Sequence, residues 1–158
     1  MLHRKCSRGF TLVEILIVVV LLGILASVVI ACFNPASTDA RRAALSQQLG
    51  TLRGQIQLYA LQHTEQMPNL TGTDWDPLVA QTTDIAGTVR GPYLPSIPRN
   101  PLNEFSGIAV VAADPSFGDA VAGESIGFIY NFNNGFIWGT NKAGDRVYNE
   151  GFPQDPNN

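Results

Sequence analysis

The chain has 158 residues, of which 45% are apolar and 15% are charged, and its formal net charge is −3 at pH 7. This length fits one domain, and the apolar fraction excludes a wholly disordered chain. The acidic balance argues against a strongly basic nucleic-acid-binding protein, and two cysteines, Cys6 and Cys32, are too few for a disulfide framework.

The amino-terminal segment combines a basic head with a long apolar run. The run from Ile15 to Phe33 has 19 residues, no charged side chain and one polar side chain, that of Ser27. A helix needs about 20 apolar residues to cross a bilayer core of about 30 Å. The pattern therefore predicts a membrane-spanning helix. Three basic residues before the run place its amino end in the cytoplasm: Arg4, Lys5 and Arg8.

Glu14 is an acidic residue near the start of this helix. It follows Phe10 by four residues, so its carboxylate would lie about 6 Å along the helix. A bare charge inside the membrane costs roughly 2.5 to 3.5 kcal/mol. Either Glu14 stays in contact with water at the headgroups, or a positive group pairs with it. Cleavage between Gly9 and Phe10 would create such a group, because the new α-amino group of a neighbouring chain could pair with Glu14.

Two other processing schemes fit a basic head followed by an apolar run. A secretory signal would be cut after a small residue such as Ala26 or Ala31. A lipoprotein signal would place a lipid on Cys32, which follows a loose version of the usual small-residue box. The lipoprotein scheme fits poorly with Glu14, and it stays open as an alternative in which the chain does not polymerise.

The stretch from Arg8 to Glu14, RGFTLVE, resembles the processing site of type IV pilins and of type II secretion pseudopilins. The resemblance implies that a prepilin peptidase cuts after Gly9 and methylates the amine of Phe10. It also implies that Glu14 helps an incoming subunit to register with the growing filament. A later stretch, GPYLPSIPRNPLN, resembles a loop of the major pseudopilins and favours that branch.

After residue 33 the apolar pattern becomes amphipathic, which predicts that the helix continues to Met67. Its apolar stripe advances by alternating steps of four and three residues: Leu45, Leu49, Leu52, Ile56, Tyr59 and His63. Pro68 supplies a stop signal. Four residues along the helix favour a kink or a break: Asn34, Pro35, Gly50 and Gly54.

Residues 68–158 are rich in turn-forming residues, which predicts a small globular domain of loops and short strands. The stretch from Asp74 to Thr82 predicts one short helix, with Asp74 as its cap. The stretch from Gly91 to Pro101 has four prolines at intervals of three. This spacing is typical of a polyproline II strut, and a stiff packed loop is the alternative.

The last part of the chain carries a strand pattern. Alternation from Ile126 to Phe132, a turn at Asn133–Gly135, and renewed alternation at Phe136 and Trp138 predict a β-hairpin. The stretch 107–113 predicts a third strand, and the aromatic face of the hairpin should cover the long helix. The predicted fold class is α+β: a long amino-terminal helix packed against a small antiparallel sheet, as in pilins.

The sequence shows no set of residues for catalysis. The two histidines, His3 and His63, stand apart, and we find no phosphate-binding loop or paired cysteine motif. Many major pseudopilins bind calcium near the carboxyl end, but the matching loop from Gly139 to Asp145 holds one acid. The stretch 114–124, with three acids, is a second candidate. We therefore expect no enzyme activity and no cofactor.

The residues and the resemblance together imply four segments. These are a leader over 1–9, a transmembrane and filament-core helix over 10–33, its amphipathic continuation over 34–67, and a globular domain over 68–158. The resemblance implies a structural subunit of a type II secretion pseudopilus, with one pass through the bacterial inner membrane and a periplasmic globular domain. Implied partners are copies of the chain, prepilin peptidase, other pseudopilins and the inner-membrane secretion platform, without nucleic acid. A type IV pilin of a surface pilus, or a periplasmic lipoprotein anchored at Cys32, are the alternatives.

Overall fold

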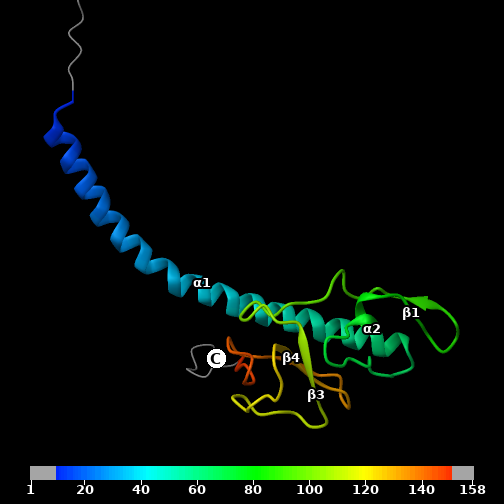
Figure 1. Ribbon diagram of the computed structural model, residues 1–158. Helices are drawn as coiled ribbons and strands as arrows, with labels where there is room; N and C mark the ends of the chain where they lie inside the picture. The colour runs from blue at the N-terminus through cyan, green and yellow to red at the C-terminus, as the bar shows by residue number, and fades with distance from the viewer. Residues whose placement is uncertain (1–9, 151–158) are drawn as a thin grey trace, which may run out of the picture. The chain divides into compact units, whose positions relative to one another are not determined.

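A computed structural model describes residues 10–150 and, over residues 28–36, the backbone without the side chains (Figure 1). The elements in chain order are α1 (Leu12–Gln62), α2 (Asp76–Val79), β1 (Thr82–Thr83), β2 (Val89–Arg90), β3 (Gly107–Val111), β4 (Ile126–Asn131) and β5 (Ile137–Gly139). They fall into two compact units, Met1–Thr38 and Asp39–Asn158. The predicted α+β class is confirmed.

Helix α1 has 51 residues and contains both Asn34 and Pro35, so the predicted break at this pair is wrong. Proline removes one backbone donor, but it keeps φ in the helical range, and the helix accommodates it. The helix ends at Gln62, before the expected end at Met67. The end follows from a Schellman-type turn, in which Thr64 has a φ of 58° and the amide of Glu65 donates to the carbonyl of Ala60 at 2.8 Å.

The second half of α1 supplies one side of the hydrophobic core. The predicted stripe is confirmed, because Leu45, Leu49, Leu52 and Ile56 are all buried. The opposite side consists of aromatic and aliphatic side chains from the sheet and the loops: Trp75, Leu78, Ile108, Phe128, Tyr130, Ile137 and Tyr148. Burial of this apolar surface holds the helix to the sheet.

The larger sheet has the strand order β3-β4-β5. The predicted hairpin is confirmed, since β4 and β5 pair antiparallel with Ile129 opposite Trp138. Strand β3 pairs parallel with β4, so the sheet is mixed rather than wholly antiparallel. A parallel neighbour needs a crossover connection, which residues 112–125 provide. All six residues of β4 are buried, because both faces of the strand are covered. Phe128 and Tyr130 lie in the main core, whereas Ile129 packs with Trp138 and Val147 in a second cluster.

The segment between α1 and β3 consists of loops, the short helix α2 and the short strands β1 and β2. Helix α2 is shorter than the expected stretch from Asp74 to Thr82, because Thr82 belongs to β1, which pairs antiparallel with β2. The carboxylate of Asp74 accepts a hydrogen bond from the amide of Asp76 at 2.9 Å. In the proline-rich stretch Tyr93 and Leu94 are buried, and both amides donate to the carbonyl of Leu78 at 2.8 Å. This stretch is therefore a packed loop rather than a free strut.

Candidate functional site

The predicted processing site begins at the edge of the described chain. Phe10 is the first described residue, and its side chain is 77% exposed. The leader residues that the sequence analysis singled out lie outside the described residues: Arg4, Lys5, Arg8 and Gly9. Trimming between Gly9 and Phe10 therefore stays a prediction.

The start of α1 explains part of the chemistry around Glu14. The amide of Glu14 donates to the hydroxyl oxygen of Thr11 at 3.3 Å, so Thr11 caps the helix. Thr11 and Glu14 have the spacing of a capping box, and a carboxylate in the first turn interacts favourably with the helix dipole. The sequence analysis missed this cap, although the pattern TLVE carries its signal. In the part of the chain that the structure describes, no ion pair with the Glu14 carboxylate is recorded.

The following turns of α1 expose apolar side chains on all faces. From Leu12 to Leu25 every large apolar side chain is between 47% and 83% exposed. A helix that packs on its own domain hides one apolar face, whereas this segment hides none. The hydroxyl of Ser27 donates to the carbonyl of Ile24 at 2.7 Å, so its polar group is satisfied within the helix. The segment thus needs an apolar environment from outside the chain, either lipid or other helices.

The predicted membrane span of residues 10–33 extends into the stretch whose side chains are not described. Cys32, the anchor of the lipoprotein alternative, lies in that stretch as well. In the residues that the structure does describe, we find no helix with both the length and the apolar character needed to cross a membrane. The prediction of a single membrane pass is therefore not confirmed.

Side-chain oxygens of Asn141 and Asp114, in the two candidate calcium segments, accept hydrogen bonds within the fold. The side-chain oxygen of Asn141 accepts hydrogen bonds from the amides of Gly144 at 2.9 Å and Asp145 at 3.2 Å. One carboxylate oxygen of Asp114 accepts from Asn131 at 2.6 Å and from Asn134 at 2.8 Å. Across the described residues no group of three or more potential metal ligands comes together. The expected lack of a cofactor stays a prediction.

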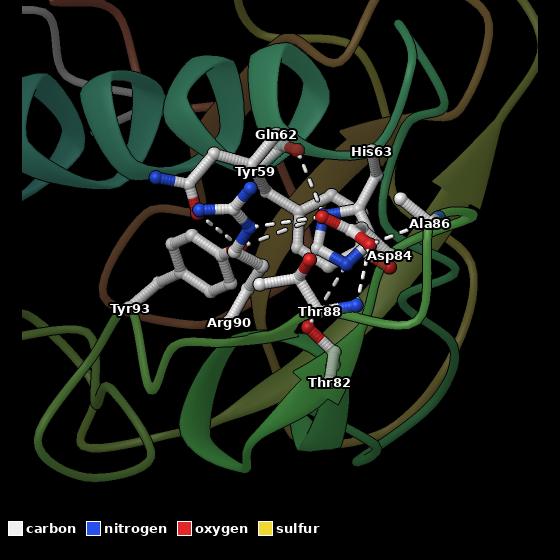
Figure 2. Close-up of polar contacts among 9 residues, drawn as sticks. All are labelled: Tyr59, Gln62, His63, Thr82, Asp84, Ala86, Thr88, Arg90 and Tyr93. Carbon is white, nitrogen blue, oxygen red and sulfur yellow. Dashed lines mark hydrogen bonds and ion pairs between the residues drawn. The ribbon is translucent and has the colours of Figure 1, made fainter.

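A cluster of polar contacts connects the carboxyl end of α1 with Thr82 and with Tyr93 of the proline-rich loop (Figure 2). His63 stacks on Tyr59 with 3.9 Å between ring centroids. Its Nδ1 lies 3.0 Å from the carbonyl oxygen of Tyr59, and its Nε2 lies 3.0 Å from the hydroxyl of Thr82. Because a carbonyl can only accept, Nδ1 donates to Tyr59, and the Thr82 hydroxyl is the hydrogen-bond partner of Nε2. The hydroxyl of Tyr93 donates to Gln62 at 2.9 Å.

The same cluster contains a carboxylate that organises the β1–β2 hairpin (Figure 2). Asp84 accepts hydrogen bonds from the amides of Thr88 at 2.8 Å and Ala86 at 3.0 Å, and from Arg90 Nε at 3.0 Å. The bond from Thr88 is the main cause that lowers the pKa of Asp84 below its ordinary value, although burial acts in the opposite direction. Burial raises the pKa of Tyr59, and the neighbouring Tyr93 adds to this shift. We assign this cluster to positioning the hairpin.

Arg53 links α1 to the strand β5 and to the end of the described chain. Its Nε and Nη2 donate to the carbonyl of Ile137 at 3.0 and 2.7 Å. Its Nη1 and Nη2 pair with both carboxylate oxygens of Glu150 at 3.0 and 2.5 Å. The guanidinium also lies over the ring of Phe136, 4.2 Å from the centroid. The sequence analysis missed this link, because residues 97 positions apart give no local signal.

The comparisons with known proteins bear on the amino-terminal segment. Residues 4–30 match the family model described as Prokaryotic N-terminal methylation motif. No curated protein and no solved structure matches the chain. The matched range contains Gly9, Phe10 and Glu14, and the motif implies processing by a prepilin peptidase and assembly into a filament. The motif, together with the α+β architecture, supports a type IV pilin-like structural subunit rather than an enzyme.

Proposed function

We propose that the chain is a structural subunit of a type II secretion pseudopilus that is anchored in the inner membrane and polymerises through its amino-terminal helix. The methylation motif over residues 4–30 carries the proposal. The apolar exposure of the segment from Leu12 to Leu25 supports it, because filament assembly provides neighbouring helices for such a surface. The subunit works by assembly rather than by turnover.

The mechanism follows from two charges of opposite sign. Trimming at Gly9 leaves a positive amine on Phe10, and Glu14 lies one helical turn further along the same chain. In an apolar environment an unpaired carboxylate is costly, whereas a carboxylate with a nearby amine is much less so. The amine of an incoming copy therefore pairs with Glu14 of a neighbour and sets the axial register. The Thr11 cap holds the first turn of the helix in shape for this contact.

The stretch GPYLPSIPRNPLN supports a pseudopilin over a surface pilin. In the structure this stretch packs against the carboxyl end of α2 through the amides of Tyr93 and Leu94. Pili and pseudopili share the amino-terminal mechanism, so the amino-terminal segment does not distinguish them. The two kinds of filament differ in length and in where they end. Deletion of the secretion pore separates them: a pseudopilin forms no long surface fibres at native expression, whereas a pilin forms them with or without the pore.

Mass spectrometry of the mature amino end tests the proposal. We expect a chain that begins at Phe10 and carries one methyl group on its amine. A chain that retains Gly9, or one whose first residue is a diacylated Cys32, would overturn the proposal. The latter result would identify the lipoprotein alternative.

A further inference from the structure

The turn between β4 and β5 contains the pair Asn134–Gly135. Nowhere else in the sequence does a glycine follow an asparagine. In such a pair the backbone nitrogen of the glycine can attack the side-chain carbonyl carbon of the asparagine, because glycine has no side chain that hinders the approach. A C–N bond forms, ammonia leaves, and water then opens the cyclic imide to aspartate or isoaspartate. The chain itself supplies the nucleophile for this deamidation.

The fold requires glycine at position 135. The φ of Gly135 is 72°, which lies in the left-handed region that favours glycine. A Cβ atom there would lie 2.5 Å from Sδ of Met67 and 3.1 Å from Cγ2 of Ile56. Ile56 belongs to the main core, and Met67 packs against it. The turn therefore keeps a reactive pair, and the reactivity of this pair depends on the contacts around it.

Hydrogen bonds engage the groups that take part in the reaction. The buried amide of Gly135 donates to the carbonyl of Asn131 at 2.8 Å, which opposes the loss of its proton. Oδ1 of Asn134 accepts from the amide of Phe136 at 2.9 Å, and Nδ2 of Asn134 donates to Asp114 at 2.8 Å. These two bonds hold the amide plane of the side chain and oppose its rotation over the glycine nitrogen.

We propose that Asn134–Gly135 is a deamidation site that the folded turn keeps inactive and that reacts when the turn opens. Asp114 controls it, because one carboxylate oxygen accepts from the side-chain amides of both Asn131 and Asn134. Asp114 thereby connects the crossover segment 112–125 to the end of β4 and to the turn. Loops and turns open locally at a lower free energy than the whole fold. The inference concerns the globular unit and does not depend on filament assembly.

Deamidation destroys the contact that prevents it. The reaction replaces the donor Nδ2 of Asn134 with a carboxylate oxygen, so two carboxylates would face each other across the bond to Asp114. Like charges at such a short distance repel each other. The loss of ammonia makes the change irreversible. A chain whose turn has opened and reacted therefore holds its crossover segment less firmly.

Peptide mass spectrometry of the full chain in detergent tests the inference. Conversion of Asn134 is followed over time at mildly alkaline pH, in the folded chain and in the same chain unfolded in urea. We expect the folded chain to react at least about tenfold more slowly, because its turn must open first. Equal rates would overturn the control by the fold. A lack of conversion at Asn134 in urea would overturn the site itself.

Removal of the Asp114 carboxylate tests its role in this control. Asp114→Ala should raise the rate in the folded chain at least about threefold, because Asn134 loses one of its two side-chain bonds. Asp119→Ala is the matched control and should react as the wild type does. Asp119 lies in the same crossover segment, but its carboxylate accepts from the amide of Ser116. Circular dichroism checks that both variants fold, and a wild-type rate in folded Asp114→Ala would contradict the role of Asp114.

An exchange of donor and acceptor provides the second readout. Asn134→Asp imitates the reacted chain and should unfold at a lower urea concentration than Asn134→Ser, which places no charge beside Asp114. Addition of Asp114→Asn should restore the midpoint of Asn134→Asp, because the pair again joins an amide to a carboxylate. A wild-type midpoint in Asn134→Asp, or no recovery in the double variant, would contradict the contact on which the inference rests.

Discussion

Two buried side-chain atoms, Gln48 Oε1 and the hydroxyl oxygen of Tyr130, have no hydrogen-bond partner among the described residues. Burial raises the pKa of Tyr130 to about 12, and the neighbouring Tyr59 contributes a smaller part of the shift. A buried hydroxyl without a partner loses its hydration and gains nothing in exchange. Tyr130 therefore contributes to stability through its ring, which packs in the main core.

We expect Tyr130→Phe to leave the free energy of unfolding unchanged or to raise it by up to about 1 kcal/mol, because the unpaired hydroxyl is removed. Tyr130→Ala, which also removes the ring, should cost about 3 to 5 kcal/mol. Urea unfolding of the full chain in detergent measures both variants. A large loss of stability in Tyr130→Phe would show that the hydroxyl has a partner after all.

The carboxylate of Asp84 predicts a pH dependence. Its pKa in the fold lies below the ordinary value of 3.8 to which it returns on unfolding. The ionised group therefore stabilises the fold above about pH 4, and this contribution disappears as the pH falls through the folded pKa. Asp84→Asn should be less stable than the wild type at pH 7, and the gap should narrow below pH 4. Unfolding curves at several pH values would contradict this account if the gap did not change.

At the scale of elements, Arg53 joins α1, β5 and the end of the described chain. Arg53→Lys should lower the free energy of unfolding by about 1 to 3 kcal/mol, because lysine cannot reproduce the paired bonds to Glu150 and Ile137. Glu150→Gln should cost less, since the bonds to Ile137 remain. A double-mutant cycle measures the coupling between residues 53 and 150. Strictly additive losses would contradict a direct link.

The elements differ in how far the sequence predicts them. The stripe from Leu45 to Ile56 and the β4–β5 hairpin follow from local periodicity and from a turn at Asn133–Gly135, and both are confirmed. The end of α1 was not predictable, because Thr64 takes a left-handed conformation that usually belongs to glycine or asparagine. The parallel pairing of β3 with β4 was not predictable either, since strand direction depends on a long connection without its own pattern.

The residues of the candidate site also differ in how far the sequence predicts them. Phe10 and Glu14 were singled out because a processing motif is a contiguous stretch of sequence. The methylation motif over residues 4–30 covers both positions, and their roles stay predictions. The bond between Arg53 and Glu150 had no such signal, because the two residues lie 97 positions apart and only the folded chain brings them together.

At the scale of the whole molecule, the two units of the chain differ in how their apolar side chains are covered. The unit Asp39–Asn158 encloses its own apolar core, whereas the apolar helix of the unit Met1–Thr38 must be covered from outside. If the leader stays attached, the nitrogen of Phe10 remains in the peptide bond to Gly9, and no free amine forms. We therefore expect Gly9→Leu to block trimming and filament formation together, because the peptidase should need a small residue there. Normal trimming in this variant, judged by intact mass, would count against the processing site.

Filament yield in Glu14→Val, measured together with intact mass, tests the central claim most directly. The claim is that Glu14 is retained in an apolar helix because it pairs with the amine of Phe10 in another copy. We predict that the variant inserts into the membrane, is trimmed and is methylated as in the wild type, yet forms no filaments. Trimmed, methylated Glu14→Val chains that assemble with wild-type yield would contradict the claim.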